Sequence, residues 1–133
     1  MFKTVLFPID QSRNSQDALE KVAELVKYCG SQLVLLTVSA SETDEENSNA
    51  VPEQAVDELL AYASQKFSQM EIEVETIHRS GRPAFCICDV ADELDVDLIM
   101  MGCRGIGLSE EHSQDSVSNR VINLSPCPVM VIP

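Results

Sequence analysis

The chain has few basic residues and no long apolar run. It has no Trp, and 9 Lys and Arg stand against 22 Asp and Glu, which gives a formal net charge of −13 over 133 residues. Such a field repels phosphate backbones and anionic lipid, and no apolar run approaches the roughly 20 residues of a membrane span. Binding to nucleic acid or to a membrane surface is therefore disfavoured, and a small anion needs a pocket that overcomes the field locally.

Metal-binding and disulfide patterns are also missing. The five cysteines are an odd number without C-x-x-C spacing, and there are two histidines, so neither a disulfide framework nor a zinc cluster is expected. The N-terminus leads straight into a strand-like segment without a signal-peptide pattern, which predicts a cytoplasmic protein. Cys103 lies in a glycine-rich loop. Two interpretations of it remain open, a redox-responsive thiol and an incidental small residue. The cysteines expected to fill the core are Cys29, Cys86, Cys88 and Cys127.

Five short apolar segments are typical of strands. Two of them, Lys3–Ile9 and Gln32–Val38, are continuously apolar, which indicates strands buried on both faces of a parallel sheet. A third, Ile72–His78, alternates with polar residues and is expected at an edge of the sheet. The remaining two are Val96–Met101 and Cys127–Ile132.

Apolar residues at three- and four-residue spacing predict helices between these strands. The expected helices are Ala18–Cys29, one from Pro52 to Met70, one that begins at Pro83, and a short one over Ser116–Leu124. The apolar side chains that the third helix is expected to turn inward are Phe85, Cys86, Val90 and Leu94. The resulting (βα)₄β order requires right-handed crossovers and a mostly parallel sheet. No segment rich in Pro, Gly or Ser divides the chain, so residues 1–133 are expected to form one α/β domain.

Two loops of the predicted sheet are suited to a ligand. In open parallel sheets, ligands bind outside the carboxyl ends of the strands, where the strand order reverses. The first strand ends in Asp10, and the fourth is followed by Gly102, Gly105 and Gly107, which let backbone N–H groups approach a ligand. The last helix begins near Ser116–Ser118 with unpaired N–H groups. If the first and fourth strands are neighbours, these features predict an anion site in an acidic protein.

Simpler interpretations exist for the same residues. Asp10 is also consistent with a carboxylate that caps the turn after the first strand. Arg104 is also consistent with a solvated loop charge, and the glycines with an ordinary turn. A phosphorelay receiver is rejected, because the third strand ends in His78-Arg79 without a phosphoacceptor Asp.

Five segments share the order and spacing of one known family. They are Val5–Asp10, Leu35–Val38, Asp97–Gly105, Ser116–Ser118 and Pro126–Ile132. On these segments the chain resembles the universal stress protein family over essentially its whole length. The resemblance implies a Rossmann-like sheet of the adenine nucleotide alpha hydrolase type, in the order 3-2-1-4-5 with helices on both faces. It also implies a homodimer formed through the last strand, Cys127–Ile132.

The resemblance further implies an adenine nucleotide, typically ATP, between the first and fourth strands. Asp10 would lie by the adenosine or a Mg²⁺ ion, and the backbone of Val38 would read the adenine edge. Met101 and Gly102 would flank the ribose and phosphates. The residues that would hold phosphates are Arg104, Gly105, Ser116 and Val117. The full set of implied nucleotide contacts is Pro8, Ile9, Asp10, Val38, Met101, Gly102, Arg104, Gly105, Gly107, Asp115, Ser116, Val117 and Ser118.

One position departs from the family pattern. That pattern is G-x-x-G, nine residues, then Gly-Ser or Gly-Thr; here Asp115 stands before Ser116, where the last glycine belongs. A carboxylate before a helix accepts hydrogen bonds from the N–H groups that a phosphate would use, worth about 1 kcal/mol to the helix. Two further acids, Glu110 and Glu111, add like charge. We therefore expect weak or Mg²⁺-dependent nucleotide binding, or a preference for fewer phosphates.

These features together predict a cytoplasmic, homodimeric, adenine-nucleotide-binding stress-response protein. It is expected to act as a binding or signalling module, because no base or water-positioning residue is identified beyond Asp10. Two alternatives remain open: a slow ATPase, and an interaction module of the same fold without a functional nucleotide site.

The Asp115→Gly variant tests whether the helix caps itself. If the Asp115 carboxylate occupies the N–H groups that the phosphates need, its removal tightens ATP binding by about fivefold. Calorimetric titration of both proteins with ATP measures the change, and equal affinities would rule out self-capping as the obstacle.

Overall fold

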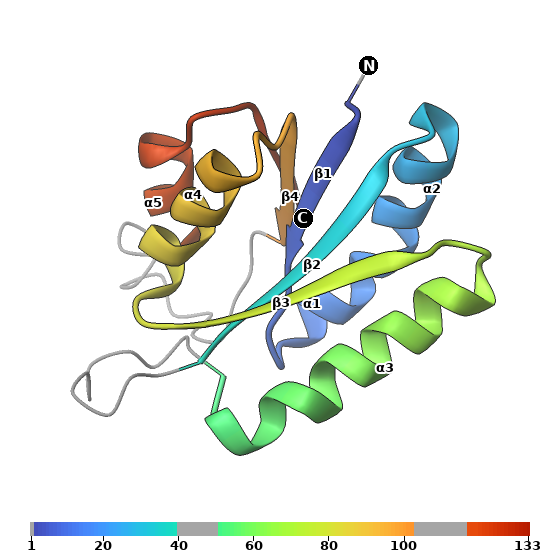
Figure 1. The fold of residues 1–133 in the computed structure, drawn as a ribbon, viewed down its shortest axis with the longest axis horizontal. Helices are drawn as coiled ribbons and strands as arrows, with labels where there is room; N and C mark the ends of the chain where they lie inside the picture. Colours follow the sequence, from blue (N-terminus) through green and yellow to red (C-terminus); the bar gives the residue numbers. More distant parts are fainter. Residues whose placement is uncertain (1, 40–50, 103–116) are drawn as a thin grey trace.

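A five-stranded parallel sheet forms the centre of the computed structural model, which describes residues 2–39, 51–102 and 117–133 (Figure 1). The strands are β1 (Thr4–Pro8), β2 (Gln32–Ser39), β3 (Val74–Ser80), β4 (Leu98–Gly102) and β5 (Val129–Ile132). They lie in the order β3-β2-β1-β4-β5, and each neighbouring pair is parallel. The expected fold class and strand order are confirmed.

Helices cover both faces of this sheet. Figure 1 shows α1, α2 and α3 on one side and α4 and α5 on the other. The helices are α1 (Arg13–Asp17), α2 (Leu19–Cys29), α3 (Val56–Gln69), α4 (Pro83–Glu93) and α5 (Val117–Leu124), with a 3₁₀ turn at Glu53–Ala55. The predicted first helix is therefore preceded by a separate short helix, α1. No helix among the described residues is both long enough and apolar enough to span a bilayer.

The core lies in two layers because the central strands are apolar on both faces. In β2 every residue from Leu33 to Ser39 is buried. One layer contains Leu35 with helices α2 and α3, and the other contains Leu36 with helices α4 and α5. In the first layer, the rings of Phe7 and Phe67 meet edge to face at 6.3 Å, a favourable aromatic geometry. Continuous apolarity thus predicts the central strands correctly.

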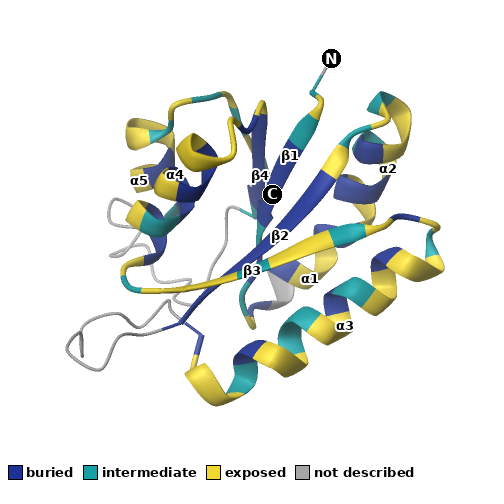
Figure 2. Ribbon diagram, viewed as in Figure 1, coloured by how far each residue is buried: buried dark blue, intermediate teal, exposed yellow. Residues whose placement is uncertain are grey.

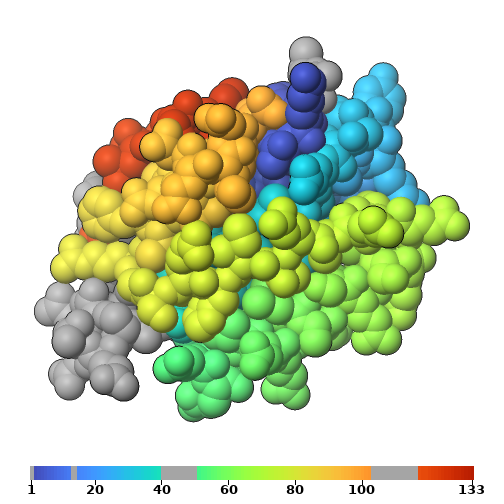
Figure 3. Space-filling model, in the orientation of Figure 1, coloured from blue at the N-terminus to red at the C-terminus, as the bar shows by residue number. Residues whose placement is uncertain are grey.

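Strand β3 forms an edge of the sheet, as its alternating pattern predicts. It pairs with β2 alone among the described strands, and most of its side chains are exposed. Figure 3 shows it along the surface between α3 and α4. The strand begins at Val74 and ends at Ser80, two residues later at each end than expected.

The buried face of α4 differs from the predicted one. Phe85 and Leu94, expected to point inward, are 47% and 37% exposed, whereas Val90 is buried and Cys86 half-buried. The buried face, visible in Figure 2, consists mainly of smaller residues: Pro83, Ala84, Ile87, Cys88, Val90 and Ala91. Small side chains at three- and four-residue spacing let the helix pack closely on the sheet, and the larger Phe85 and Leu94 are left outside.

The cysteines follow the prediction in part. Cys88 is buried, whereas Cys29, Cys86 and Cys127 are half-buried. Burial, with a smaller contribution from the carboxylate of Asp89, raises the pKa of the Cys86 and Cys88 thiols. Both side chains therefore remain protonated packing groups at neutral pH. Cys103 lies outside the described residues.

Candidate functional site

The strand order reverses between β1 and β4. From β1 the chain proceeds to β2 and β3 on one side, and then returns to place β4 and β5 on the other. In the β1–β4 register, Val5 lies opposite Leu98 and Leu6 opposite Ile99. Two residues further along both strands, Pro8 and Met101 reach the same carboxyl rim. The loops after these two strands, singled out from the sequence, therefore start side by side at the switch point, where open α/β sheets bind ligands.

The structure describes eight of the thirteen implied nucleotide contacts. Pro8, Ile9 and Asp10 end or follow β1, and Met101 and Gly102 end β4. Val38 lies near the end of β2, and Val117 and Ser118 begin α5, which packs on α4 and β5. The implied contacts that lie outside the described residues are Arg104, Gly105, Gly107, Asp115 and Ser116, together with the acids Glu110 and Glu111. Most of the implied phosphate contacts therefore remain a prediction.

A short hydrogen-bonded turn holds Asp10 at the end of β1. Its Oδ1 accepts the backbone N–H of Ser12 at 2.8 Å, and its own N–H donates to Ser15 Oγ at 3.1 Å. Ser12 Oγ accepts the N–H of Ser15 at 3.1 Å, which caps the first turn of α1. The structural interpretation of Asp10 is thus realised. The roles of Ser12 and Ser15 were not predicted from the sequence. The pattern that could have indicated them is Ser-x-x-Ser at the start of a helix, with Ser12 just before α1 and Ser15 inside it.

The same turn leaves Asp10 able to bind a ligand. Its side chain is half-buried, and the described residues donate no hydrogen bond to its second carboxylate oxygen. One such oxygen together with phosphate oxygens and water is a usual environment for Mg²⁺. A ligand-binding role, which the sequence predicts for Asp10, would use the other oxygen and is compatible with the turn.

The carbonyl group of Val38 already has a partner. The N–H of Ile9 donates to the carbonyl of Leu36 at 2.8 Å, so the Leu36 carbonyl faces β1. Carbonyls two residues apart in a strand point to the same side, so the Val38 carbonyl also faces the side of β1. There it accepts the N–H of Val51 at 2.9 Å. Val51 is 2% exposed and forms an isolated parallel bridge with Ser39. Val51, which sequence reasoning missed, thus lies beyond the end of β1, bonded to the carbonyl of the Val38 backbone that was expected to read an adenine edge.

Polar side chains join the carboxyl ends of β2 and β3. Ser39 Oγ is buried and lies 2.7 Å from His78 Nε2 and 2.9 Å from Ser80 Oγ. The N–H of Gly81 donates to the Ser39 carbonyl at 3.0 Å, and Gly81 has a φ of 141°. A residue with a Cβ is disfavoured there, because that φ is strained and the added atom would lie 3.1 Å from Cys86 Sγ. These contacts fix the start of α4 relative to the rim.

Comparison with known proteins agrees with this geometry. The model of the universal stress protein family matches residues 1–133. The universal stress protein Sll1654 of Synechocystis is 52% identical, over 100% of this chain and 87% of the relative. A solved universal stress protein in complex with cAMP superposes with a TM-score of 0.82 at 19% identity, over 99% of this chain and 97% of the other. One from Archaeoglobus fulgidus in complex with dAMP gives 0.72 at 21% identity, over 100% and 98%. The chain belongs to the universal stress protein family.

Proposed function

We propose that this protein binds an adenine nucleotide at the carboxyl rim between β1 and β4, as a cytoplasmic stress-response module. The observation that carries the proposal is the side-by-side start of the loops after β1 and β4, with Asp10 after one and Gly102 at the end of the other. Two solved proteins of the same fold are complexes with cAMP and dAMP. Both ligands are adenine nucleotides with a single phosphate; the preference for fewer phosphates that Asp115 suggests for this chain stays a prediction.

Each part of the nucleotide has a candidate partner. Asp10 offers its second carboxylate oxygen to the ribose hydroxyls or to Mg²⁺. Gly102 lets the chain approach the ribose and phosphates without a Cβ, and the N–H groups at the start of α5 favour an anion. These groups are sufficient to bind a nucleotide and to hold it in place, and none of them is assigned a step in a reaction. We therefore propose that the protein acts as a binding and signalling module.

A second candidate function is an interaction module that binds no nucleotide. The observation in its favour is the hydrogen bond from Val51 to the Val38 carbonyl, at 2.9 Å, because a carbonyl with a partner gains less from a base. The carbonyl keeps a second lone pair, so this contact weakens a hydrogen bond from a base to Val38 but does not prevent it.

Calorimetric titration with ATP, ADP and AMP, with and without Mg²⁺, separates the two candidates. We expect all three nucleotides to bind, with Mg²⁺ strengthening ATP binding more than AMP binding, because the metal neutralises phosphate charge near an acidic loop. The Asp10→Asn variant keeps an oxygen for the Ser12 N–H and places an NH2 group where the second oxygen was, which still hydrogen-bonds a ribose hydroxyl but does not bind a metal. It should therefore bind AMP to within about threefold of the wild type and lose about tenfold in the Mg²⁺ effect on ATP. Binding of none of the three nucleotides would contradict the proposal, and sub-micromolar ATP binding without metal would contradict the weak phosphate site.

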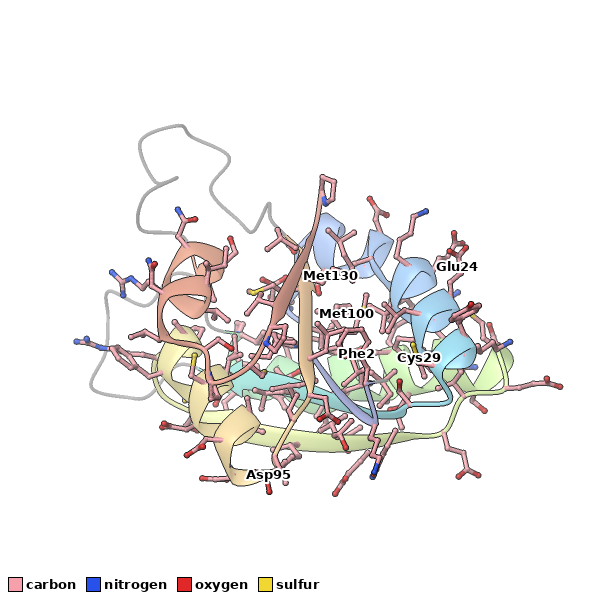
Figure 4. The ribbon with its side chains drawn as sticks, turned by 90° about the horizontal axis from the view of Figure 1, so that it is seen from above. Phe2, Glu24, Cys29, Asp95, Met100 and Met130 are labelled. Atoms are coloured by element: carbon pink, nitrogen blue, oxygen red, sulfur yellow. The ribbon has the colours of Figure 1, made fainter. Side chains whose placement is uncertain are left out.

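We also propose that β5 pairs with its copy in a second protomer. Ile99 donates its N–H to the Pro128 carbonyl at 3.0 Å, so alternate residues of β5 bond to β4 and those between them, Val129 and Val131, face the open edge. Figure 4 shows β5 beside β4, with Met130 next to Met100. Met130 is 38% exposed, and an apolar edge strand of this kind favours pairing with another strand.

The Val131→Pro variant tests this pairing. Proline removes an N–H that faces outward, so we expect a folded protein whose dimer dissociates at least about tenfold more readily, since both copies lose a hydrogen bond. The matched variant Met130→Pro removes an N–H that faces β4 and should lower the stability of the monomer. Sedimentation at tens of micromolar measures the oligomeric state, and a wild-type protein that is purely monomeric there would rule out the dimer.

A further inference from the structure

Thr37 carries a buried hydroxyl without a hydrogen-bond partner. Its side chain is 0% exposed, and Oγ1 is the buried side-chain polar atom in the described part of the chain that lacks a partner. A buried hydroxyl that loses water without gaining a partner lowers the stability of the folded protein. A buried polar group without a partner in a native protein needs an explanation. One explanation is a hydrogen bond that forms only when a ligand is bound.

The position of Thr37 places this hydroxyl at the ligand rim. Leu36 lies opposite Pro8, so the next residue of β2, Thr37, lies beside the next residue after β1, Ile9, which precedes Asp10. On its other side Thr37 lies opposite His78. Because side chains alternate along a strand, Thr37 shares the sheet face of Leu35, toward the layer of α2 and α3. The unpartnered hydroxyl is therefore one residue from the Asp10 turn and one from the Val38 carbonyl.

The surroundings of Thr37 suit a flat apolar group with a polar edge. Ile9, its neighbour across the sheet on the same face, is 6% exposed, and Val51, which bridges to Ser39, is 2% exposed. Ser39, the next residue of β2 on the same face, already shares its hydroxyl with His78 and Ser80. Among the buried side-chain polar atoms of the described residues, the one without a partner is the hydroxyl of Thr37. A purine base has apolar faces and polar edge atoms.

We propose that the Thr37 hydroxyl is the polar contact for the base edge of the bound nucleotide. The proposal rests on the proposed adenine-nucleotide site and adds a residue that the implied set of contacts lacks. A threonine hydroxyl both donates and accepts, so it bonds to a ring nitrogen or to the exocyclic amine of adenine. The base displaces the side chains that cover the hydroxyl, and the new hydrogen bond supplies part of the binding affinity.

The isosteric variant Thr37→Val tests the contact, with adenosine, AMP and ATP as the three probes. Because the lost bond is to the base, we expect the same loss of affinity for all three, about three- to tenfold. The melting temperature of the unliganded variant should equal or exceed that of the wild type, because a buried unpartnered group is gone. Thr37→Ser keeps the hydroxyl and should recover most of the affinity. The control is Thr76→Val, the same change at an exposed position opposite Leu35, which should leave affinity unchanged.

Three results would overturn the inference. Wild-type affinity of Thr37→Val for all three probes would show that the hydroxyl touches no ligand. A loss for AMP and ATP without a loss for adenosine would place the contact at the phosphate. If the wild-type protein binds none of the probes, the proposed nucleotide site itself fails, and the Thr37 contact fails with it.

Discussion

The parallel pairing of β1 with β4 is the contact on which the rest of the structure depends. It places the point of strand reversal at the middle of the sheet, and it brings Asp10 and Gly102 to one rim from positions about ninety residues apart in the chain. The pairing persists because both strands are buried on both faces: in β1, Leu6 and Phe7 are each 0% exposed, one toward each helix layer. Hydrophobic burial thus determines where the candidate site lies.

At this rim the groups that could bind a ligand also hold the protein together. One oxygen of Asp10 stabilises the turn into α1, and the Val38 carbonyl is bonded to Val51. Asp115, at the expected start of the last helix, is predicted to compete with phosphate in the same way. Thr37 is the exception among the described residues, because its hydroxyl is buried without a partner. Binding strength at this site is therefore the difference between contacts made to the ligand and internal contacts weakened.

Much of the fold could be predicted from the sequence, because continuous apolar runs such as Gln32–Val38 are characteristic of buried parallel strands. The strand order came from the resemblance to a family, since hydrophobic patterning does not show which strands are neighbours. The prediction for the buried face of α4 was wrong, because small residues such as Ala84 and Ala91 let the helix pack closely on the sheet, and the larger Phe85 stays outside. The role of Val51 could not be predicted, because one residue joins the sheet through a single backbone hydrogen bond that no side-chain pattern reveals.

The central claim is that the nucleotide binds between β1 and β4. Most of the implied phosphate contacts are expectations from the family resemblance, so the position of the ligand is the part of the claim to test. A hollow lies at the opposite, amino end of the sheet, an open groove of about 770 Å³ lined by Lys27, three glutamates (Glu71, Glu73 and Glu75) and their neighbours. Its excess of acids disfavours an anion. Backbone amide NMR of the isotopically labelled protein during titration with AMP distinguishes the two places. We expect the signals of Ile9, Asp10 and Gly102 to move and those of Glu71, Glu73 and Glu75 to stay; movement confined to these glutamates, or none at all, would contradict a nucleotide site between β1 and β4.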